Sequence, residues 1–261
     1  MTKILKKVMT QPKRVISSRI RSRGIKRLEM AKNEKRNGRT LIEDNNMRYR
    51  KNRKIVHRKY STVTPIFKNK TVFLIGGGPS LENFNWDLLK EKSIIAINKS
   101  FLSVPWAQVI YWTDSRFYTW YKDKIDELTA EKYTVGVGSQ YKPDVKLLQK
   151  GMRHGLELTN DKLAHGDNSG YAAINLAYHL GAKNIILLGY DMGIKGNKTH
   201  FHDGYPVKPT SKAIYHNRFI KAFPHILEPL EKRGVKVYNI SNNNLLDCFK
   251  KTTIEAALNF S

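Results

Sequence analysis

Residues 71–81 read TVFLIGGGPSL, an apolar run that passes directly into three glycines, a proline and a serine. A continuous apolar run of this length is typical of a strand buried on both faces of a sheet. Glycines after such a strand let the backbone approach a ligand, and Pro79-Ser80 can begin a helix whose N–H groups face an anion. The stretch predicts an α/β fold with a phosphate-binding turn, and the alternative is a tight strand-to-helix turn without a ligand.

The chain beyond residue 65 repeats this alternation of strands and helices. We predict strands at 71–75, 93–97, 108–112, 133–137, 184–188 and 235–240, and helices at 80–91, 116–130, 144–150, 169–180 and 212–233. Such alternation indicates a Rossmann-like, mostly parallel, doubly wound sheet that binds ligands beyond the carboxyl ends of its strands. The glycine-rich turn has neither the G-x-G-x-x-G nor the Walker A spacing, which argues against a NAD dehydrogenase or a P-loop kinase.

The first 60 residues carry most of the net charge. They contain 21 Lys and Arg against 4 Asp and Glu, which leaves +17 of the formal +25 of the whole chain. Because apolar residues are scarce there, we expect a basic N-terminal arm at 1–65, helical at 16–30 or disordered, and a Rossmann-like transferase domain at 66–261. The arm can bind nucleic-acid phosphates, an anionic membrane surface or nothing. Its expected nucleic-acid contacts are Arg14, Arg19, Arg21, Arg23, Lys26 and Arg27.

The composition excludes several classes of protein. A hydrophobic fraction of 40% is too high for a wholly disordered chain. The single cysteine, Cys248, cannot form an internal disulfide, and no Cys/His cluster has zinc-finger spacing. The apolar runs are far shorter than the roughly 20 residues of a membrane span, and no secretory signal follows the basic N-terminus. We therefore expect a soluble, cytoplasmic protein.

Polar residues follow the other predicted strands, at the edge where this fold binds ligands. Asn98 offers donors and acceptors to a base or ribose, while Asp114 can hold a sugar hydroxyl, assist acid–base chemistry or only cap the next helix. A capped helix start at Asp167, Asn168 or Ser169 leaves N–H groups free for a phosphate or carboxylate. Several polar strand ends together favour a ligand site over a structural scaffold.

The loop after residue 191 supplies candidate acid–base groups, because His200, His202 and Asp203 lie close together in it. A histidine on a mobile loop titrates near neutrality and can close over a substrate. His216, on the last long predicted helix, is an alternative candidate for the acid–base group. Two histidines and one acid are weak evidence for a metal site, so we assign no metal ligand. The candidate catalytic residues are His202, His216, His200 and Asp114.

Four stretches resemble the MptE-like domain family, which is named after an archaeal 6-hydroxymethylpterin diphosphokinase and is common in phage and bacterial genomes. They read VFLIGGGPSL, IIAINKSF, NSGYAAINLAYHLGAKNIILLGYDM and KTHFHDGYP. The same elements are similar to those of bacterial lipooligosaccharide sialyltransferases, which commonly have Asn where this chain has Gly77 and Thr113. The resemblance covers about residues 70–245. It implies a histidine base and a nucleotide site at Gly76, Gly77, Gly78, Pro79, Ser80, Asn98, Thr113, Ser169, Gly170 and Asp191.

This resemblance implies a nucleotide-dependent transferase, and we expect a glycosyltransferase with a nucleotide-sugar donor of the CMP or UDP type. One alternative is a diphosphokinase that transfers from Mg-ATP to a pterin-like alcohol, with Asp114, Asp191 or Asp203 holding Mg²⁺. Another is a non-catalytic nucleic-acid-binding or virion-associated protein that acts through the arm. A phage-encoded protein would work in the bacterial host cytoplasm or in the virion.

Overall fold

The computed structural model describes residues 59–136, 140–196, 198–202, 204–207, 210–241 and 245–260. The predicted helix at 16–30 and the six basic arm residues named above lie outside these ranges, and so does Asp203. Ser61 and Val63, just before the expected boundary at 65/66, hydrogen-bond through their N–H groups to Leu147 O and Asn160 O, at 2.7 and 2.8 Å. Among the described helices, none has the length and apolar character needed to cross a membrane.

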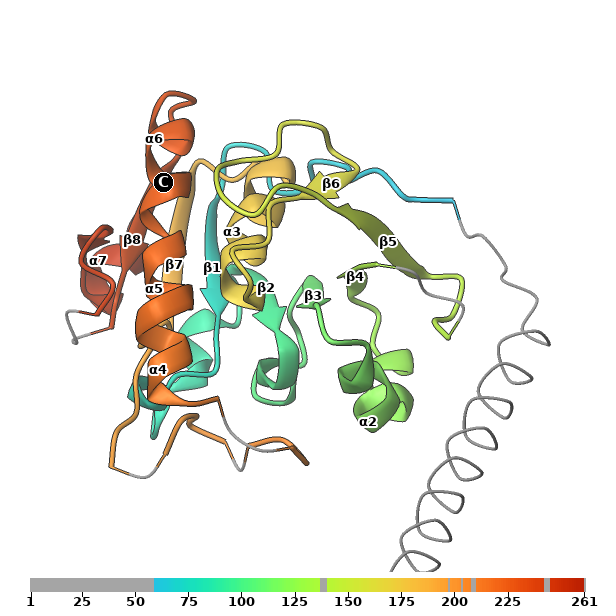
Figure 1. Ribbon diagram of the computed structural model, residues 1–261, viewed down its shortest axis with the longest axis horizontal. Coiled ribbons are helices and arrows are strands. Elements are labelled where there is room, and N and C mark those ends of the chain that lie inside the picture. Colours follow the sequence, from blue (N-terminus) through green and yellow to red (C-terminus); the bar gives the residue numbers. More distant parts are fainter. Residues whose placement is uncertain are drawn as a thin grey trace, which may run out of the picture. The chain divides into compact units, whose positions relative to one another are not determined.

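Within the described residues, nine strands form one sheet in the order β6-β5-β4-β3-β2-β1-β7-β8-β9 (Figure 1). The strands are β1 (Thr71–Ile75), β2 (Ser93–Ile97), β3 (Val109–Trp112), β4 (Glu131–Val135), β5 (Val145–Lys150), β6 (Lys162–Leu163), β7 (Asn184–Leu188), β8 (Lys236–Asn239) and β9 (Lys250–Lys251). Every pairing is parallel. The chain runs outward from β1 to β6 and then returns to the other side of β1, which confirms the predicted doubly wound fold.

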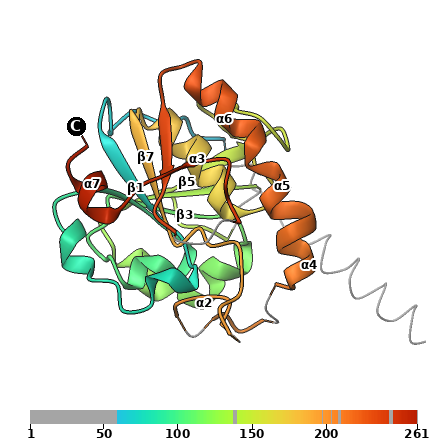
Figure 2. The same cartoon turned by 90° about the vertical axis from the view of Figure 1, so that its left-hand side faces the viewer.

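Helices cover both faces of the sheet, as Figures 1 and 2 show. On β1, Val72 and Leu74 pack into one layer while Phe73 and Ile75 pack into the other, as the side-chain alternation of a strand requires. The first layer is completed by α3 (Ser169–His179), α5 (Ile220–Ala222) and α6 (Pro224–Glu231). The second contains η1 (Pro79–Leu81), η2 (Trp86–Leu89), η3 (Asn98–Leu102), α2 (Ser115–Asp126) and α7 (Ile254–Leu258).

Two predicted helices are wrong. The helix predicted at 144–150 is instead strand β5, Val145–Lys150, in which Val145 and Leu147 pack into one layer and Leu148 into the other. Residues 80–91 form the short 3₁₀ helices η1 and η2, because Asn83 between them adopts a left-handed backbone with φ 64°. The predicted helix at 212–233 is interrupted by a π-helical turn, η4 (Tyr215–Phe219), between α4 (Lys212–Ile214) and α5.

Candidate functional site

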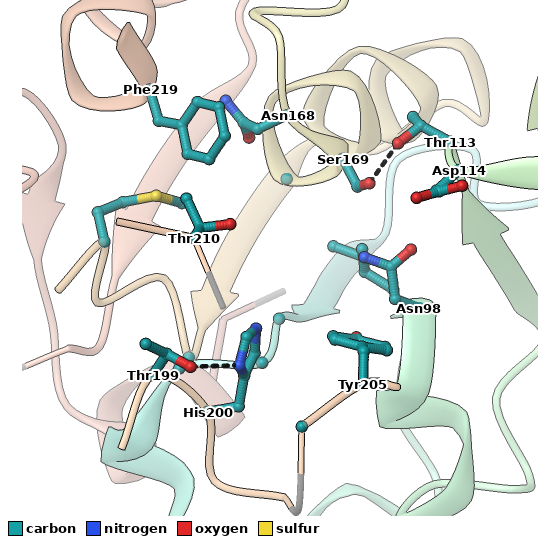
Figure 3. A pocket seen from close by; sticks show the side chains of 18 of the residues that line it. Asn98, Thr113, Asp114, Asn168, Ser169, Thr199, His200, Tyr205, Thr210 and Phe219 are labelled. Carbon is teal, nitrogen blue, oxygen red and sulfur yellow. Dashed lines mark hydrogen bonds between the residues drawn. The ribbon is translucent and has the colours of Figure 1, made fainter. Parts of the chain in front are cut away.

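A pocket of about 560 Å³ opens at the carboxyl ends of β1, β2, β3 and β7 (Figure 3). This is the edge at which a doubly wound sheet binds ligands. Of the residues predicted from sequence, the pocket wall contains Gly76, Gly77, Gly78, Asn98, Thr113, Asp114, Ser169, Gly170 and His200. Residues far apart in the sequence therefore meet in one cavity, and part of its wall is formed by Thr199, His200, Gly204, Tyr205, Val207 and Thr210.

Most N–H groups of the turn after β1 donate hydrogen bonds to residues at or just after the end of β7. The three bonds, each of 2.8 Å, run from Gly76 to Leu188 O, from Gly78 to Gly189 O and from Ser80 to the Asp191 carboxylate. Pro79 has no N–H, and the Gly77 N–H has no acceptor among the residues that the structure describes. A ligand can therefore draw on one backbone donor of this turn, at Gly77.

Close packing between the two loops also explains two of the three glycines. A Cβ on Gly76 would lie 2.7 Å from Gly189 O, and one on Gly78 would overlap the Asp191 carboxylate. A Cβ on Gly77 would instead lie 2.8 Å from Cδ2 of His200, a side chain of the pocket wall. Gly76 and Gly78 thus serve the packing of the turn itself, whereas Gly77 approaches a histidine of the pocket wall.

Asp191 lies behind the pocket rather than in its wall. Its side chain is buried, with 3% of the residue exposed, and its carboxylate accepts hydrogen bonds from the Ser80 N–H and the Ser241 hydroxyl. Ser80 is exposed and Pro79 is buried, and neither lines the pocket. These three predicted nucleotide contacts therefore shape the turn that presents Gly77.

Asn98 supplies a polar group to the pocket wall. Its backbone is left-handed, with φ 51°, and its side-chain amide has no hydrogen-bond partner in the described part of the chain. Figure 3 shows the amide on the pocket wall between Tyr205 and Asp114. An amide with free donors and acceptors at this position can bind the polar edge of a base or a ribose hydroxyl.

The first turn of α3 presents further donors. The Asn168 side chain caps the helix by accepting the Tyr171 N–H at 2.8 Å, as a predicted cap should. The N–H groups of Ser169 and Gly170 have no acceptors among the described residues, and both residues line the pocket. The Ser169 hydroxyl lies 2.6 Å from that of Thr113, so this bond ties the helix start to the end of β3 (Figure 3). The helix start is therefore held in place and open to an anion.

The carboxylates of the pocket wall are already paired with arginines. Asp114 caps α2 and forms an ion pair of 2.6 Å with Arg116, whose hydrogen bonds hold the pKa of that carboxyl below its usual value. Burial alone would raise the pKa of Asp167, but Arg218 at 2.9 Å and Arg153 at 2.7 Å lower it. No three described His, Cys, Asp or Glu residues are arranged to hold a metal ion.

His200 is the one candidate histidine in the described pocket wall. Its Nδ1 lies 2.8 Å from the Thr199 hydroxyl, and its ring meets the Tyr205 ring edge-on at 5.3 Å (Figure 3). Burial, and secondly the charge of Lys99, lower the pKa of His200 below its ordinary value. The ring is therefore neutral at pH 7 and can accept a proton.

The other two histidines have less suitable positions. His202 stacks on His200 with ring centres 4.8 Å apart, and its Nδ1 accepts the Gly204 N–H at 3.0 Å. Its Nε2 is buried without a partner among the described residues, and burial, assisted by His200 and Lys99, lowers the pKa of His202 to about 3. His216 is exposed on η4 and does not line the pocket.

An aromatic wall lines the pocket where packing in the core is the simpler expectation from sequence. It consists of Phe117, Trp120, Tyr190, Tyr205, Tyr215 and Phe219. The ring centres of Trp120 and Tyr205 lie 6.3 Å apart, and the Arg116 guanidinium lies 5.6 Å from the Trp120 ring centre. The signal was the aromatic stretch at 112–121, whose members divide between the core and this wall.

No protein-family model matches the chain, and no curated protein matches it. Among solved structures, its fold is similar to that of the sialyltransferase CstII from Campylobacter jejuni in complex with a substrate analogue, cytidine-5'-monophosphate. The two chains are 17% identical, with a TM-score of 0.44, and the match covers 74% of this chain and 89% of the other.

Proposed function

We propose that the protein is a nucleotide-dependent transferase, and specifically a glycosyltransferase that uses a nucleotide-sugar donor. The observation that carries the proposal is a set of unused donors in one pocket. They are the N–H groups of Gly77, Ser169 and Gly170, all at the carboxyl edge of the sheet. Backbone N–H groups at a turn and a helix start suit the phosphates of a nucleotide.

The rest of the pocket suits a nucleoside. The free amide of Asn98 can bind a base edge or a ribose hydroxyl, and the neighbouring Trp120 and Tyr205 offer aromatic surface to a base. A volume of about 560 Å³ lies within the range of small-molecule sites. The polar and aromatic halves of the wall thus match the two halves of a nucleotide.

The transfer would be a direct displacement at the anomeric carbon of the donor sugar. A bond forms from the acceptor oxygen to that carbon, the bond from the carbon to the phosphate oxygen breaks, and the acceptor proton passes to His200. The Thr199 hydroxyl, 2.8 Å from Nδ1, fixes the orientation of the imidazole. The Gly77 N–H and the start of α3 would stabilise the charge of the departing phosphate.

Metal-independent transfer is favoured over Mg-ATP-dependent diphosphoryl transfer, which is the activity implied by the name of the MptE-like family. A diphosphokinase needs carboxylates that are available to Mg²⁺. Asp114 and Asp167 are instead neutralised by arginines, and Asp191 is buried behind the turn. Arginines also occupy the carboxylate oxygens that a metal would need.

The test is thermal stabilisation by CMP, UDP, GDP, ADP and ATP, each with and without Mg²⁺, at salt high enough to suppress phosphate binding to the basic arm. A ligand at 100 times its Kd adds roughly 2.7 kcal/mol to stability, so binding gives a clear rise in Tm. We expect one nucleotide to stabilise the protein without Mg²⁺. Stabilisation by ATP and Mg²⁺ alone would favour the diphosphokinase, and no response to any nucleotide would overturn both.

A matched pair of variants tests the assigned pocket. Asn98 and Asn83 both have left-handed backbones, with φ 51° and 64°, so glycine relieves strain at both positions. Only Asn98 lines the pocket. We expect Asn98→Gly to weaken nucleotide binding about tenfold, since a polar contact is lost, and Asn83→Gly to bind as the parent does. Equal binding by both variants would remove Asn98 from the site.

A further inference from the structure

A second cavity, of about 460 Å³, adjoins the first and shares part of its wall. The shared residues are Thr113, Asp114, Asp167, Asn168, Thr210 and Phe219. They include the cap of α3 and the end of β3, and the next residue, Ser169, offers a free N–H to the first pocket. A phosphate seated on the start of α3 would therefore lie beside the wall that the two cavities share.

The second cavity has an excess of positive charge. Arg218 lines it and shares the single carboxylate of Asp167 with Arg153, so two guanidinium groups face one acid. Lys150 also lines it and has no ion pair in the part of the chain that the structure describes. The other acid of its wall, Asp114, is neutralised by Arg116. About two positive charges thus remain unmatched at this cavity.

The neutral form of His165 adds a donor. This residue lines the second cavity, and its Nδ1 accepts the Asp167 N–H at 3.0 Å, so the neutral ring carries its proton on Nε2. Burial, and then the charge of Lys150, lower the pKa of His165 and keep the ring neutral at pH 7. The described cavity wall thus combines two cations with an N–H donor, a set suited to an anion rather than to a neutral group.

We propose that this second cavity binds the acceptor of the transfer reaction and that the acceptor is a saccharide bearing an anionic group, a carboxylate or a phosphate, held by Lys150 and Arg218. The proposal rests on the function proposed above. The shared wall would let the acceptor hydroxyl reach the donor carbon while the anionic group stays on the far side. Both cations are exposed, which makes the cavity accessible to a large acceptor.

Binding of simple sugars to the full-length protein tests this, measured by ligand-observed NMR at elevated salt, with and without the nucleotide that stabilises the protein. The probes are methyl β-glucuronide, glucose 6-phosphate and the neutral methyl β-glucoside. We expect one anionic probe to bind at least about fivefold more tightly than the neutral one. A preference for the glucuronide would identify a carboxylate acceptor, and a preference for the sugar phosphate a phosphorylated one.

Three variants locate the binding. Lys150→Gln and Arg218→Gln should each remove the preference, whereas Lys221→Gln, the same charge change on nearby α5 outside the cavity wall, should keep it. Nucleotide affinity should stay the same in all three. Equal binding of all probes, no binding of either anionic probe, or a preference that survives both cavity variants would overturn the proposal. If no nucleotide binds but the anionic probes still do, the result counts against the proposed donor site and leaves the second cavity supported. The two outcomes can be told apart because probe binding is also measured without nucleotide.

Discussion

The buried carboxylate of Asp191 accepts a hydrogen bond of 2.8 Å from the backbone N–H of Ser80, 111 residues earlier in the chain. This bond joins the turn after β1 to the loop after β7, two neighbouring strands in the interior of the sheet. The shape of the pocket floor is therefore fixed by the protein itself, before any ligand binds.

Removal of that carboxylate should destabilise the fold. In Asp191→Ala the Ser80 N–H and the Ser241 hydroxyl lose their acceptor, which should lower the free energy of unfolding by about 2–4 kcal/mol. Asp191→Asn keeps one oxygen and should lose less. Urea denaturation measures both, with Asp123→Ala on the exposed side of α2 as the control. An Ala variant as stable as the control would show that the bond contributes nothing.

Neighbouring glycines should respond differently to the same methyl group. Gly78→Ala would overlap the Asp191 carboxylate and approach Gly189 O to 2.6 Å, so the free energy of unfolding should fall by about 3 kcal/mol. Gly77→Ala meets the edge of the His200 ring and, at 3.5 Å, Nε2 of His202, which are side-chain rather than backbone atoms, and should cost less, about 1 kcal/mol, while reducing turnover. Denaturation and a donor-turnover assay separate the two effects, and equal losses of stability would contradict this geometry.

His200→Asn should slow transfer about 100-fold without a change in donor Kd, because the proposed base is lost while the phosphate contacts remain. In the parent, the pKa of His200 is lowered, so the acid limb of the pH profile should lie below pH 6.5. Activity should fall as the pH decreases through that limb and the ring becomes protonated. His225→Asn, an exposed histidine of α6, is the control. An unchanged rate in His200→Asn would remove His200 from the mechanism.

Acid should destabilise the protein through its buried histidines. The pKa of His202 is about 3 in the folded protein against 6.5 for an ordinary histidine, so the unfolded chain takes up the proton first. The contribution of neutral His202 to the free energy of unfolding is therefore fully present above pH 6.5 and is lost progressively as the pH falls toward 3. At pH 5 we expect His202 alone to cost about 1 kcal/mol. His202→Asn should flatten the dependence of Tm on pH between 7 and 5, and a curve parallel to the parent's would refute this.

The basic arm should bind nucleic acid without sequence preference. Fluorescence anisotropy with a random duplex should show an affinity that falls steeply with salt and is lost in a chain that begins at residue 59. Nucleotide stabilisation should be equal in the two chains, since the pocket lies in the remaining domain. Equal DNA binding by the truncated chain would place the polyanion site elsewhere.

Hydrophobic pattern alone predicts the central strands correctly. The bounds of β1, β2 and β7 agree with the sequence prediction to the residue, because each is a short run buried on both faces between clear turn signals. Strand β5 was predicted as a helix, since VKLLQK has three apolar residues at spacings that suit either structure. Its position beside β4 is a tertiary effect that local pattern does not contain.

Residues chosen because they follow strands do lie together in one pocket. Asn98, Thr113 and Ser169 meet in the pocket because parallel strands bring their carboxyl ends to one edge. Asp191 also follows a strand, but its carboxylate is buried behind the turn, and sequence does not reveal side-chain direction after a strand ends. The choice among the histidines depends on tertiary contacts beside His200 and His202, such as the bond from the Phe201 N–H to Gly77 O, at 3.0 Å.

The position of β1 between β2 and β7 has a consequence for synthesis on the ribosome. One neighbour, β2, emerges soon after β1, but the other, β7, pairs Thr71 with Asn184 and so appears more than a hundred residues later. Until then one edge of this apolar strand has no partner, which favours pairing with other nascent chains. Translation speed between β2 and β7 should therefore govern how much of the newly made protein reaches its native state, and the pocket floor is among the last features to form.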